Sequence, residues 1–449
     1  MRHDPIDRIL KPIDSFIHNQ SAAGLVLLIS TAVAVVLANS PWSHDYQAIW
    51  EHTISLQVAG FALERTVHHL INDGLMAVFF FLVALELKRE FIGGELSEPR
   101  NALLPIAASI GGMAAPALIY LAINEFSGPA TAGWGIPMGT DTAFVLGLLA
   151  LLGKRVPPAL KVFFITVSVA DDIGSVTVIA LFYTSDIEMQ KLLLGGIFLV
   201  ALIAMNVLGV RNVIAYGVVG IAGVWLAFLL SGVHATVAGV LAALTIPART
   251  KIQEHTYVVR LRELADEFER TESSPHAIIT SEQQHLIRKI RRMSDHAETP
   301  LQRLEQALHP WVVYVVMPLF ALANAGIELP ASVGDVLSSP ITLGVLLGLV
   351  LGKPIGIVGM AFLVSKLGWG RLGQGLTWSH VVGIGVMSGL GFTMSVFINE
   401  LAFDDLAMQY TAKLGILFAS LIAGPLGFVL LRRVSASASE APPRAIVSR

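Results

Sequence analysis

The chain lacks cysteine altogether and carries few charged residues. The absence of cysteine from its 449 residues excludes disulfides, thiol catalysis and cysteine-ligated metals. Charged residues make up only 14% of the chain and hydrophobic residues 54%. A soluble domain carries about 25% charged residues, so this composition identifies an integral membrane protein. The net charge of −3 gives no indication of a nucleic-acid partner.

Long hydrophobic runs predict an all-α polytopic membrane protein with about twelve membrane-spanning helices. The expected spans are 22–39, 72–87, 103–123, 132–152, 158–183, 192–209, 213–231, 233–247, 310–327, 341–365, 378–399 and 411–431. Segment 1–21 lacks the short apolar core and cleavage site of a signal peptide, so the first span is expected to be retained.

The distribution of lysine and arginine predicts that both termini are cytoplasmic. With that orientation 26 of the 30 basic residues face the cytoplasm, and only Arg65 and Lys191 lie outside. One membrane domain is then organised as a cytoplasmic segment 1–21, spans one to eight over 22–247, a charged cytoplasmic segment 248–309, spans nine to twelve over 310–432, and a cytoplasmic tail 433–449.

Two segments outside the membrane have a pattern of their own. In 53–65, apolar residues alternate around Gly60, which predicts a small extracytoplasmic β-hairpin. It is either an ordered loop or an exposed edge that pairs with a second subunit in a homodimer. Segment 248–309 predicts two charged amphipathic helices, 257–272 and 281–307. A solvated cytoplasmic face explains them most simply, although His255, His276, His285 and His296 would also suit a pH-responsive element.

Helix breakers interrupt the fourth and eleventh spans at corresponding places. In the fourth span, Pro137 and several glycines precede Thr140, Asp141 and Thr142, which predicts a break near 137–141. Four glycines precede Thr393 in the eleventh span. Close helix packing is an alternative explanation for the glycines. Spans three to five and ten to twelve would form inverted repeats, a pattern that marks the binding site of a transporter.

Four ionisable residues within the predicted spans are the candidates for a functional site. Asp171 and Asp172 are adjacent in an apolar run, Asp141 is at the fourth-span break, and Lys353 is in the tenth span. A buried charge strongly opposes insertion into the bilayer, so these residues indicate a functional site. Lys353 is expected to pair with one of the two adjacent aspartates while the other faces a water-filled cavity. Their spacing does not determine which, because neighbouring helical residues point about 100° apart.

The donor atoms of this group favour a small hard cation. Carboxylates, the hydroxyls of Thr140 and Thr142, and backbone carbonyls suit Na⁺ or Li⁺ rather than a soft metal. Two close carboxylates cannot both ionise at low cost, so protons and the cation compete for the same oxygens. Competition at one alternately exposed site is an antiport mechanism.

Several weaker candidates lie near the ends of the spans. Glu86, Arg89 and Glu90 end the second span and would form either a charged funnel mouth or an ordinary interfacial cluster. Glu305 lies at the cytoplasmic entrance of the ninth span. His234 lies at a short turn near the outer face, where a structural histidine is the default interpretation.

These residues carry motifs that resemble the NhaA-type sodium/proton antiporters of bacteria. The motifs are NDGLMAVFFFLVALELKRE, GTDTAFVLG, VADDIGS, SGVHATVAG, HPW, GKPIGI and GLGFTMS, within about residues 15 to 432. The resemblance implies a multi-pass protein of the bacterial inner membrane that exports Na⁺ or Li⁺ against more than one inward proton. It implies no cofactor, and the inverted-repeat architecture of this family is a known example.

The resemblance also implies a role for each matching residue. Asp172 would be the principal Na⁺ ligand, Asp171 would pair with Lys353, and Asp141 with Thr140 would lie where the interrupted helices cross. Residues in regions tied to pH response would be Glu86, Arg89, Glu90, Glu305 and His234. One departure concerns that response: segment 248–309 is longer than the connection expected, and position 306 is Gln.

Two other classes of function fit an intramembrane acid cluster. An intramembrane aspartyl protease would use two acids from separate spans, but the acids here lack the Gly-x-Gly-Asp pattern and Lys353 has no role in that chemistry. A cation channel would be distinguished by currents larger than a carrier can sustain.

Overall fold

The computed structural model describes residues 20–439 apart from 59–60, 185–186, 272–277, 330–333, 335–337 and 374. Its first elements are α2 (Gln20–Ala38), α3 (Ser43–Glu51), β1 (Thr53–Val58), β2 (Phe61–Thr66), α4 (Val67–His69), η1 (Leu70–Leu75), α5 (Met76–Gly93), η2 (Glu95–Ser97), α6 (Pro99–Ile123), η3 (Pro129–Met138), α7 (Thr142–Leu152), η4 (Gly153–Arg155) and α8 (Pro158–Phe182).

The second part of the chain is also helical. Its elements are α9 (Met189–Val207), α10 (Val213–Val218), η5 (Val219–Trp225), α11 (Leu226–Leu229), α12 (Ala235–Thr245), α13 (Glu254–Arg270), α14 (Ser281–Ala297), α15 (Pro300–Trp311), η6 (Val312–Val316), α16 (Met317–Asn324), α18 (Pro340–Leu347), η7 (Gly348–Gly352), α19 (Lys353–Lys366), α20 (Trp378–Met387), α21 (Phe392–Ala402) and α22 (Leu406–Ser439).

The fold is that of a polytopic membrane protein. Among the described residues, eight helices are long and apolar enough to cross a bilayer, or up to ten if each of two bent pairs is one span. The bent pairs are Ala22–Ala38 with Ser43–Glu51, at 114°, and Trp378–Met387 with Phe392–Ala402, at 48°. Val213–Leu229 and Ala235–Thr245 are shorter apolar helices.

Some helix boundaries differ from those predicted. The second charged helix ends at Ala297 rather than near 307, and the helix that contains the predicted ninth span begins at Pro300 rather than 310. Pro300 disfavours a helical conformation in Thr299, whose side chain instead accepts a hydrogen bond from the Gln302 amide. Helix α3 is not among the predicted elements.

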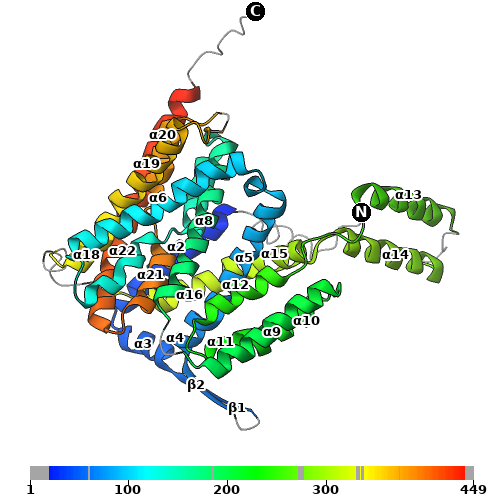
Figure 1. The fold of residues 1–449 in the computed structure, drawn as a ribbon, viewed down its shortest axis with the longest axis horizontal. Helices are drawn as coiled ribbons and strands as arrows, with labels where there is room; N and C mark the ends of the chain where they lie inside the picture. The colour runs from blue at the N-terminus through cyan, green and yellow to red at the C-terminus, as the bar shows by residue number, and fades with distance from the viewer. Residues whose placement is uncertain are drawn as a thin grey trace, which may run out of the picture.

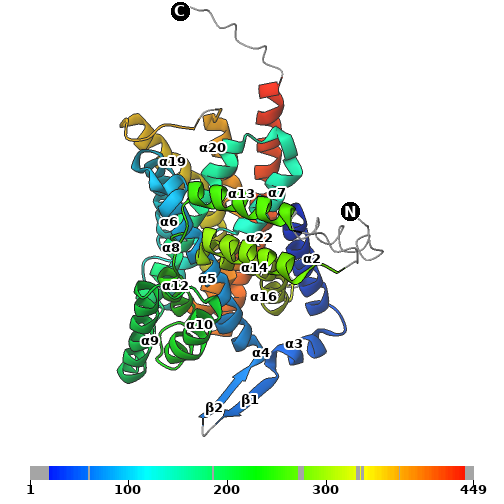
Figure 2. The same cartoon turned by 90° about the vertical axis from the view of Figure 1, so that its right-hand side faces the viewer.

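Strands β1 and β2 pair antiparallel, from Thr53 with Thr66 to Val58 with Phe61, and the two residues that connect them lie outside the described part. The pair projects from the helical body at one end of the molecule, while α13 and α14 project elsewhere (Figures 1 and 2).

Close helix contact holds the centre of the body together. Helices α6 and α19 pack along each other, and at their crossing Gly111 and Gly356 face one another. A Cβ atom on Gly356 would overlap the Gly111 carbonyl oxygen, and one on Gly111 would overlap the Gly356 carbonyl oxygen. Only glycine permits this approach. The crossing brings the middle of α6 next to the start of α19, where Lys353 lies.

We predict that Gly356→Ala destabilises the protein because the added methyl group forces the α6 and α19 backbones apart. Overpacking of this kind costs roughly 1–3 kcal/mol. Thermal unfolding in detergent measures the effect as a lowered Tm. Gly359→Ala is the matched control, because a Cβ there meets nothing within 4 Å. Equal Tm values for the two variants would contradict the close contact.

Candidate functional site

The fourth span is interrupted where the sequence predicts. A 3-10 helix, η3, ends at Met138, and the α-helix α7 begins at Thr142. Gly139 lies between them with extended backbone, and a Cβ there would meet the Ser395 amide nitrogen at 2.9 Å. The break in the fourth span therefore lies directly against the eleventh span.

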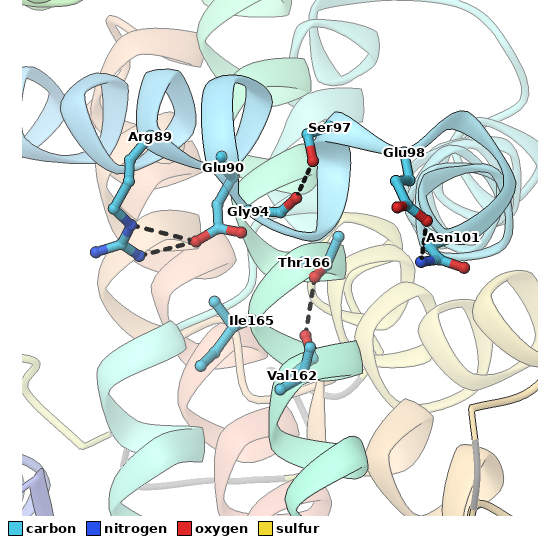
Figure 3. Close-up of a pocket in the computed structure, with 10 residues that line it drawn as sticks. Arg89, Glu90, Gly94, Ser97, Glu98, Asn101, Val162, Ile165 and Thr166 are labelled. Carbon is cyan, nitrogen blue, oxygen red and sulfur yellow. Dashed lines mark hydrogen bonds and ion pairs between the residues drawn. The ribbon is translucent and has the colours of Figure 1, made fainter. Parts of the chain in front are cut away.

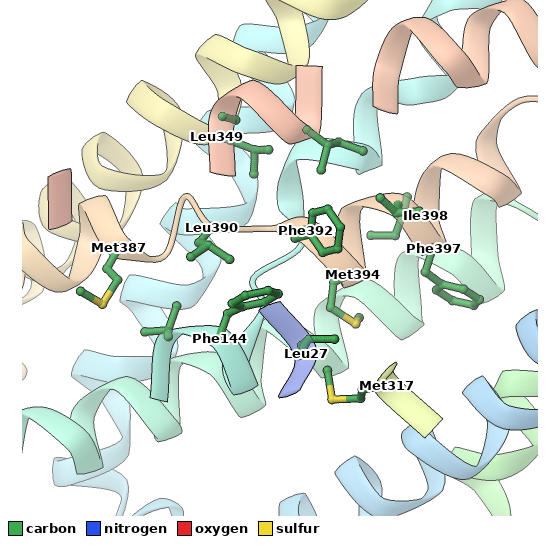
Figure 4. Close-up of a cluster of buried hydrophobic side chains, with 14 of the residues drawn as sticks. Leu27, Phe144, Met317, Leu349, Met387, Leu390, Phe392, Met394, Phe397 and Ile398 are labelled. Carbon is green, nitrogen blue, oxygen red and sulfur yellow. The ribbon is translucent and has the colours of Figure 1, made fainter. Parts of the chain in front are cut away.

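The eleventh span is interrupted at the same place in space. Helix α20 ends at Met387, and α21 begins at Phe392 after a bend of 48°. The connecting segment passes over α7, and apolar side chains surround the crossing (Figure 4). Among them, the rings of Phe144 and Phe392 pack edge to face with centroids 5.9 Å apart. Unwound backbone at this depth is tolerated because protein covers it.

Asp141 joins the two interruptions. Its carboxylate oxygen Oδ1 accepts the Phe144 amide at 3.2 Å, in the first turn of α7. Its Oδ2 accepts the amide of Thr393 at 3.0 Å and the hydroxyl of the same residue at 2.5 Å, in the first turn of α21. Asp141 is fully buried. One carboxylate thus satisfies backbone donors at two helix N-termini and opposes the positive ends of both helix dipoles.

Asp171 of helix α8 forms a buried ion pair with Lys353. The Lys353 Nζ lies 2.7 Å from Asp171 Oδ2, with exposed side-chain fractions of 0% and 1%. Lys353 also donates to the Thr140 hydroxyl at 2.7 Å, and Thr140 donates to Asp171 Oδ2 at 2.9 Å. The pairing implied by the resemblance is therefore present. A charge pair in so apolar a setting is stable only because its hydrogen bonds are also satisfied.

Ser109 is a further partner of Asp171 that was not predicted from the sequence. Ser109 lies in helix α6, is fully buried, and donates to Asp171 Oδ1 at 2.8 Å. Asp171 is thus held by donors from three other segments of the chain: α6, the break in the fourth span, and α19. The sequence contains a signal for this residue, because Ser109 carries a hydroxyl group in the middle of the apolar run IAASIGGMAAP. Serine is common enough in membrane helices to pass unnoticed.

Asp172 differs from the other two buried aspartates. It is 4% exposed, and its carboxylate accepts no hydrogen bond from any described residue. Asp171, Glu86, Lys353 and Asp141 lie close enough to act on its charge. Asp172 is therefore the buried aspartate that no described residue holds by a hydrogen bond.

A cavity of about 400 Å³ opens between the end of α5, the start of α6 and the first half of α8. Figure 3 shows it lined by Arg89, Glu90, Glu98 and Thr166 among others. Thr166 precedes Asp172 by six residues, which is roughly 9 Å along a helix. Ile165, which also lines the cavity, precedes Asp172 by about two helical turns and lies on the same face of α8.

Charged residues border this cavity on its α5 side. Arg89 Nη2 lies 2.9 Å from Glu90 Oε1, and a second guanidinium nitrogen pairs with Glu305 of α15. Glu86 lies one turn earlier on α5 and interacts electrostatically with both Glu305 and Asp172. Four of the five residues named for the entrance and the pH response thus lie together near the end of α5.

His234 lies at the other end of helix α12 from that group. Its Nε2 is 2.6 Å from the Tyr183 carbonyl oxygen, and the Tyr183 hydroxyl donates to the Ala132 carbonyl at 2.7 Å. At the far end of α12, Lys88 of α5 donates to the carbonyls of Leu244 and Ile246. His234 therefore links α8 and η3 to α12, and the structure does not bring it to Arg89 and Glu305.

A polytopic membrane protein with a buried carboxylate site at the crossing of two interrupted helices has the architecture of an ion-coupled transporter. In the described part of the chain, no group of three or more His, Asp or Glu residues is arranged to hold a resident metal ion. Na⁺ would be cargo at this site.

Comparison with known proteins identifies the family. A family model described as Na⁺/H⁺ antiporter 1 matches residues 14–431. The Na(+)/H(+) antiporter NhaA of Oleidesulfovibrio alaskensis is 45% identical over 429 residues, covering 95% of each chain. That of Acidithiobacillus ferrooxidans is 44% identical over 438 residues, covering 97% of this chain and all of its own. The chain belongs to the NhaA family of Na⁺/H⁺ antiporters.

A double-mutant cycle tests the buried ion pair. Lys353→Met leaves the Asp171 charge buried and unpaired, which typically costs 3–5 kcal/mol. We predict a large fall in Tm for Lys353→Met and partial recovery when Asp171→Asn is added, because the second change removes the unpaired charge. Lys366→Met, at the exposed end of the same helix, is the control. Strictly additive effects of the two substitutions would show that the pair does not interact.

Proposed function

We propose that the protein exports Na⁺ or Li⁺ from bacteria in exchange for protons, as an electrogenic secondary active transporter of the inner membrane. The observation that carries this proposal is the difference between the adjacent carboxylates of Asp171 and Asp172. Asp171 is fixed by Ser109, Thr140 and Lys353, whereas Asp172 has no hydrogen-bond partner among the described residues.

Asp172 is the principal cation ligand in this proposal. When it loses its proton, a hard cation binds its carboxylate oxygens, and the hydroxyl of Thr140 and nearby backbone carbonyls supply further oxygen ligands. Asp171 joins the ligands only if the cation displaces the Lys353 ammonium. The cation therefore competes with a proton at Asp172 and with the positive charge of Lys353 at Asp171. The proposal includes the exchange of more than one proton for each Na⁺, as the family resemblance implies, which makes transport electrogenic.

Alternating access operates through the two interrupted spans. Asp141 remains bound to the N-termini of α7 and α21. The cation binds near the C-termini of η3 and α20, which carry partial negative charge. Small rearrangements at this crossing would open the site to one side or the other. The charged group of Glu86, Arg89, Glu90 and Glu305 would set the access of ions from the cytoplasm and its pH dependence, with His234 acting separately from the opposite end of α12.

The membrane arrangement in this proposal has twelve spans and cytoplasmic termini. The two shorter apolar helices, Val213–Leu229 and Ala235–Thr245, would complete the number. Helix α6, the η3–α7 span and α8 would form one repeat, and α18–α19, α20–α21 and α22 its inverted counterpart. Segments 1–21, 248–309 and 433–449 would be cytoplasmic. The strands β1 and β2 would lie outside and pair with a second copy in a homodimer.

An intramembrane aspartyl protease receives no support from the geometry. Its mechanism needs two carboxylates that share a proton across a substrate. Here Asp141 is occupied by the N-termini of α7 and α21, and Asp171 by Lys353.

Ion exchange in everted membrane vesicles tests the transport site. After a pH gradient is preset, addition of Na⁺ or Li⁺ should collapse it in vesicles that contain the protein. Asp172→Asn should abolish the response, because an amide binds the cation weakly and exchanges no proton. Asp404→Asn is the matched control, since Asp404 is an exposed carboxylate between α21 and α22. Normal exchange by Asp172→Asn would refute the assignment of Asp172.

A further inference from the structure

Helices α13 and α14 form a hairpin attached to the ends of two apolar helices. The Leu301 amide, in the first turn of α15, donates to the carbonyl of Pro247, just after α12. The Lys251 amide donates to the carbonyl of His296 at the end of α14. The hairpin projects from the body, and in both views α14 lies on the side of α13 toward strands β1 and β2 (Figures 1 and 2). Its base is therefore only a few residues from helices that enter the membrane.

One face of α14 is covered by α13. Leu286 and Met293 of α14 are buried, and the facing residues of α13 recur at Tyr257, Leu261 and Phe268. The Tyr257 hydroxyl lies 3.1 Å from Ser294 Oγ, which fixes the two helices together. The hairpin thus holds α14 in place and leaves its opposite face open.

The open face of α14 is basic. The run Arg288-Lys289-Ile290-Arg291-Arg292 places four basic residues within little more than one turn, and all four are exposed. None of them forms an ion pair with a described residue, in contrast to Arg303, which lies near Asp295 and Glu298.

The four basic residues are not equivalent. Lys289 and Arg292 line a cavity of about 360 Å³ together with Glu263 and Glu267 of α13, so their charge is partly opposed. Arg288 and Arg291 are not among the residues that line it. Beside them, Ile287 is 43% exposed. Arg288 and Arg291 thus lie next to an exposed apolar side chain on the side of α14 that α13 does not cover.

We propose that this face of α14 docks onto the anionic lipid headgroups of the membrane in which the protein is embedded. Arginine guanidinium groups bind phosphate with paired hydrogen bonds, and each basic residue near an anionic surface strengthens the attraction. Ile287 would enter the boundary between headgroups and acyl chains, as apolar residues of interfacial helices do. The position of the hairpin base, a few residues from α12 and α15, places α14 within reach of that surface. The proposal is independent of the transport site.

The absence of cysteine from the chain allows a clean test with one attached fluorophore. Full-length protein carrying Ile287→Cys is labelled with an environment-sensitive dye and placed in nanodiscs of phosphatidylcholine alone or with one third phosphatidylglycerol. In the anionic discs we expect a blue-shifted emission, quenching by brominated lipid, and reversal of both at high salt. Val259→Cys is the matched control, because Val259 is 42% exposed on the outward side of α13. It should show no such change.

Charge substitutions make the test specific. Arg288, Arg291 and Arg292 changed together to Gln should abolish the lipid-dependent shift at position 287. The same change at the exposed Arg260, Arg262 and Arg270 of α13 should preserve it. Equal emission in both lipids, or equal loss with both triple variants, would overturn the proposal. Na⁺/H⁺ exchange measured on the same proteins keeps this result separate from the transport mechanism.

Discussion

The buried carboxylate of Asp141 is the constraint on which the centre of the molecule depends. Two membrane helices that break at the same depth expose backbone donors and positive dipole ends where no water can satisfy them. Asp141 accepts hydrogen bonds from the first turns of both α7 and α21, and its own amide donates to the Leu390 carbonyl at 2.8 Å. Because one side chain binds the N-termini of both helices, it holds the two interruptions in contact. This contact also fixes the positions of Thr140 and of the α20–α21 connection.

That arrangement divides the buried acids by their partners. Asp141 is committed to the helix ends, and Asp171 to Lys353, Thr140 and Ser109. Asp172 alone has no hydrogen-bond donor among the described residues. It lies on α8, which lines the cavity between α5 and α6. An unpaired carboxylate in an apolar interior is energetically costly. In a transporter, either a proton or a cation could bind such a carboxylate and lower this free-energy cost. Because both would bind the same oxygens, only one of them could bind at a time.

Much of this site could be predicted from the residues themselves. Charged residues within apolar runs marked Asp141, Asp171, Asp172 and Lys353, and Pro137 with its neighbouring glycines located the first break. The choice of Asp171 as the partner of Lys353 could not be derived from spacing, because it depends on how α8 and α19 meet in space. The same limit hid Ser109, whose importance comes from the close α6–α19 crossing at Gly111 and Gly356. The break between α14 and α15 at Pro300 was not predicted, because the amphipathic pattern of the sequence continues across it.

The number of protons released when Na⁺ binds tests competition at Asp172 most directly. Purified protein in weakly buffered detergent solution is mixed with NaCl at a series of pH values, with choline chloride as the control. We predict proton release that is largest where the site is partly protonated, that vanishes at high pH where the carboxylate is already ionised, and that is absent in Asp172→Asn. Sodium binding with no proton release at any pH, or undiminished proton release by Asp172→Asn, would contradict competition between Na⁺ and a proton at Asp172.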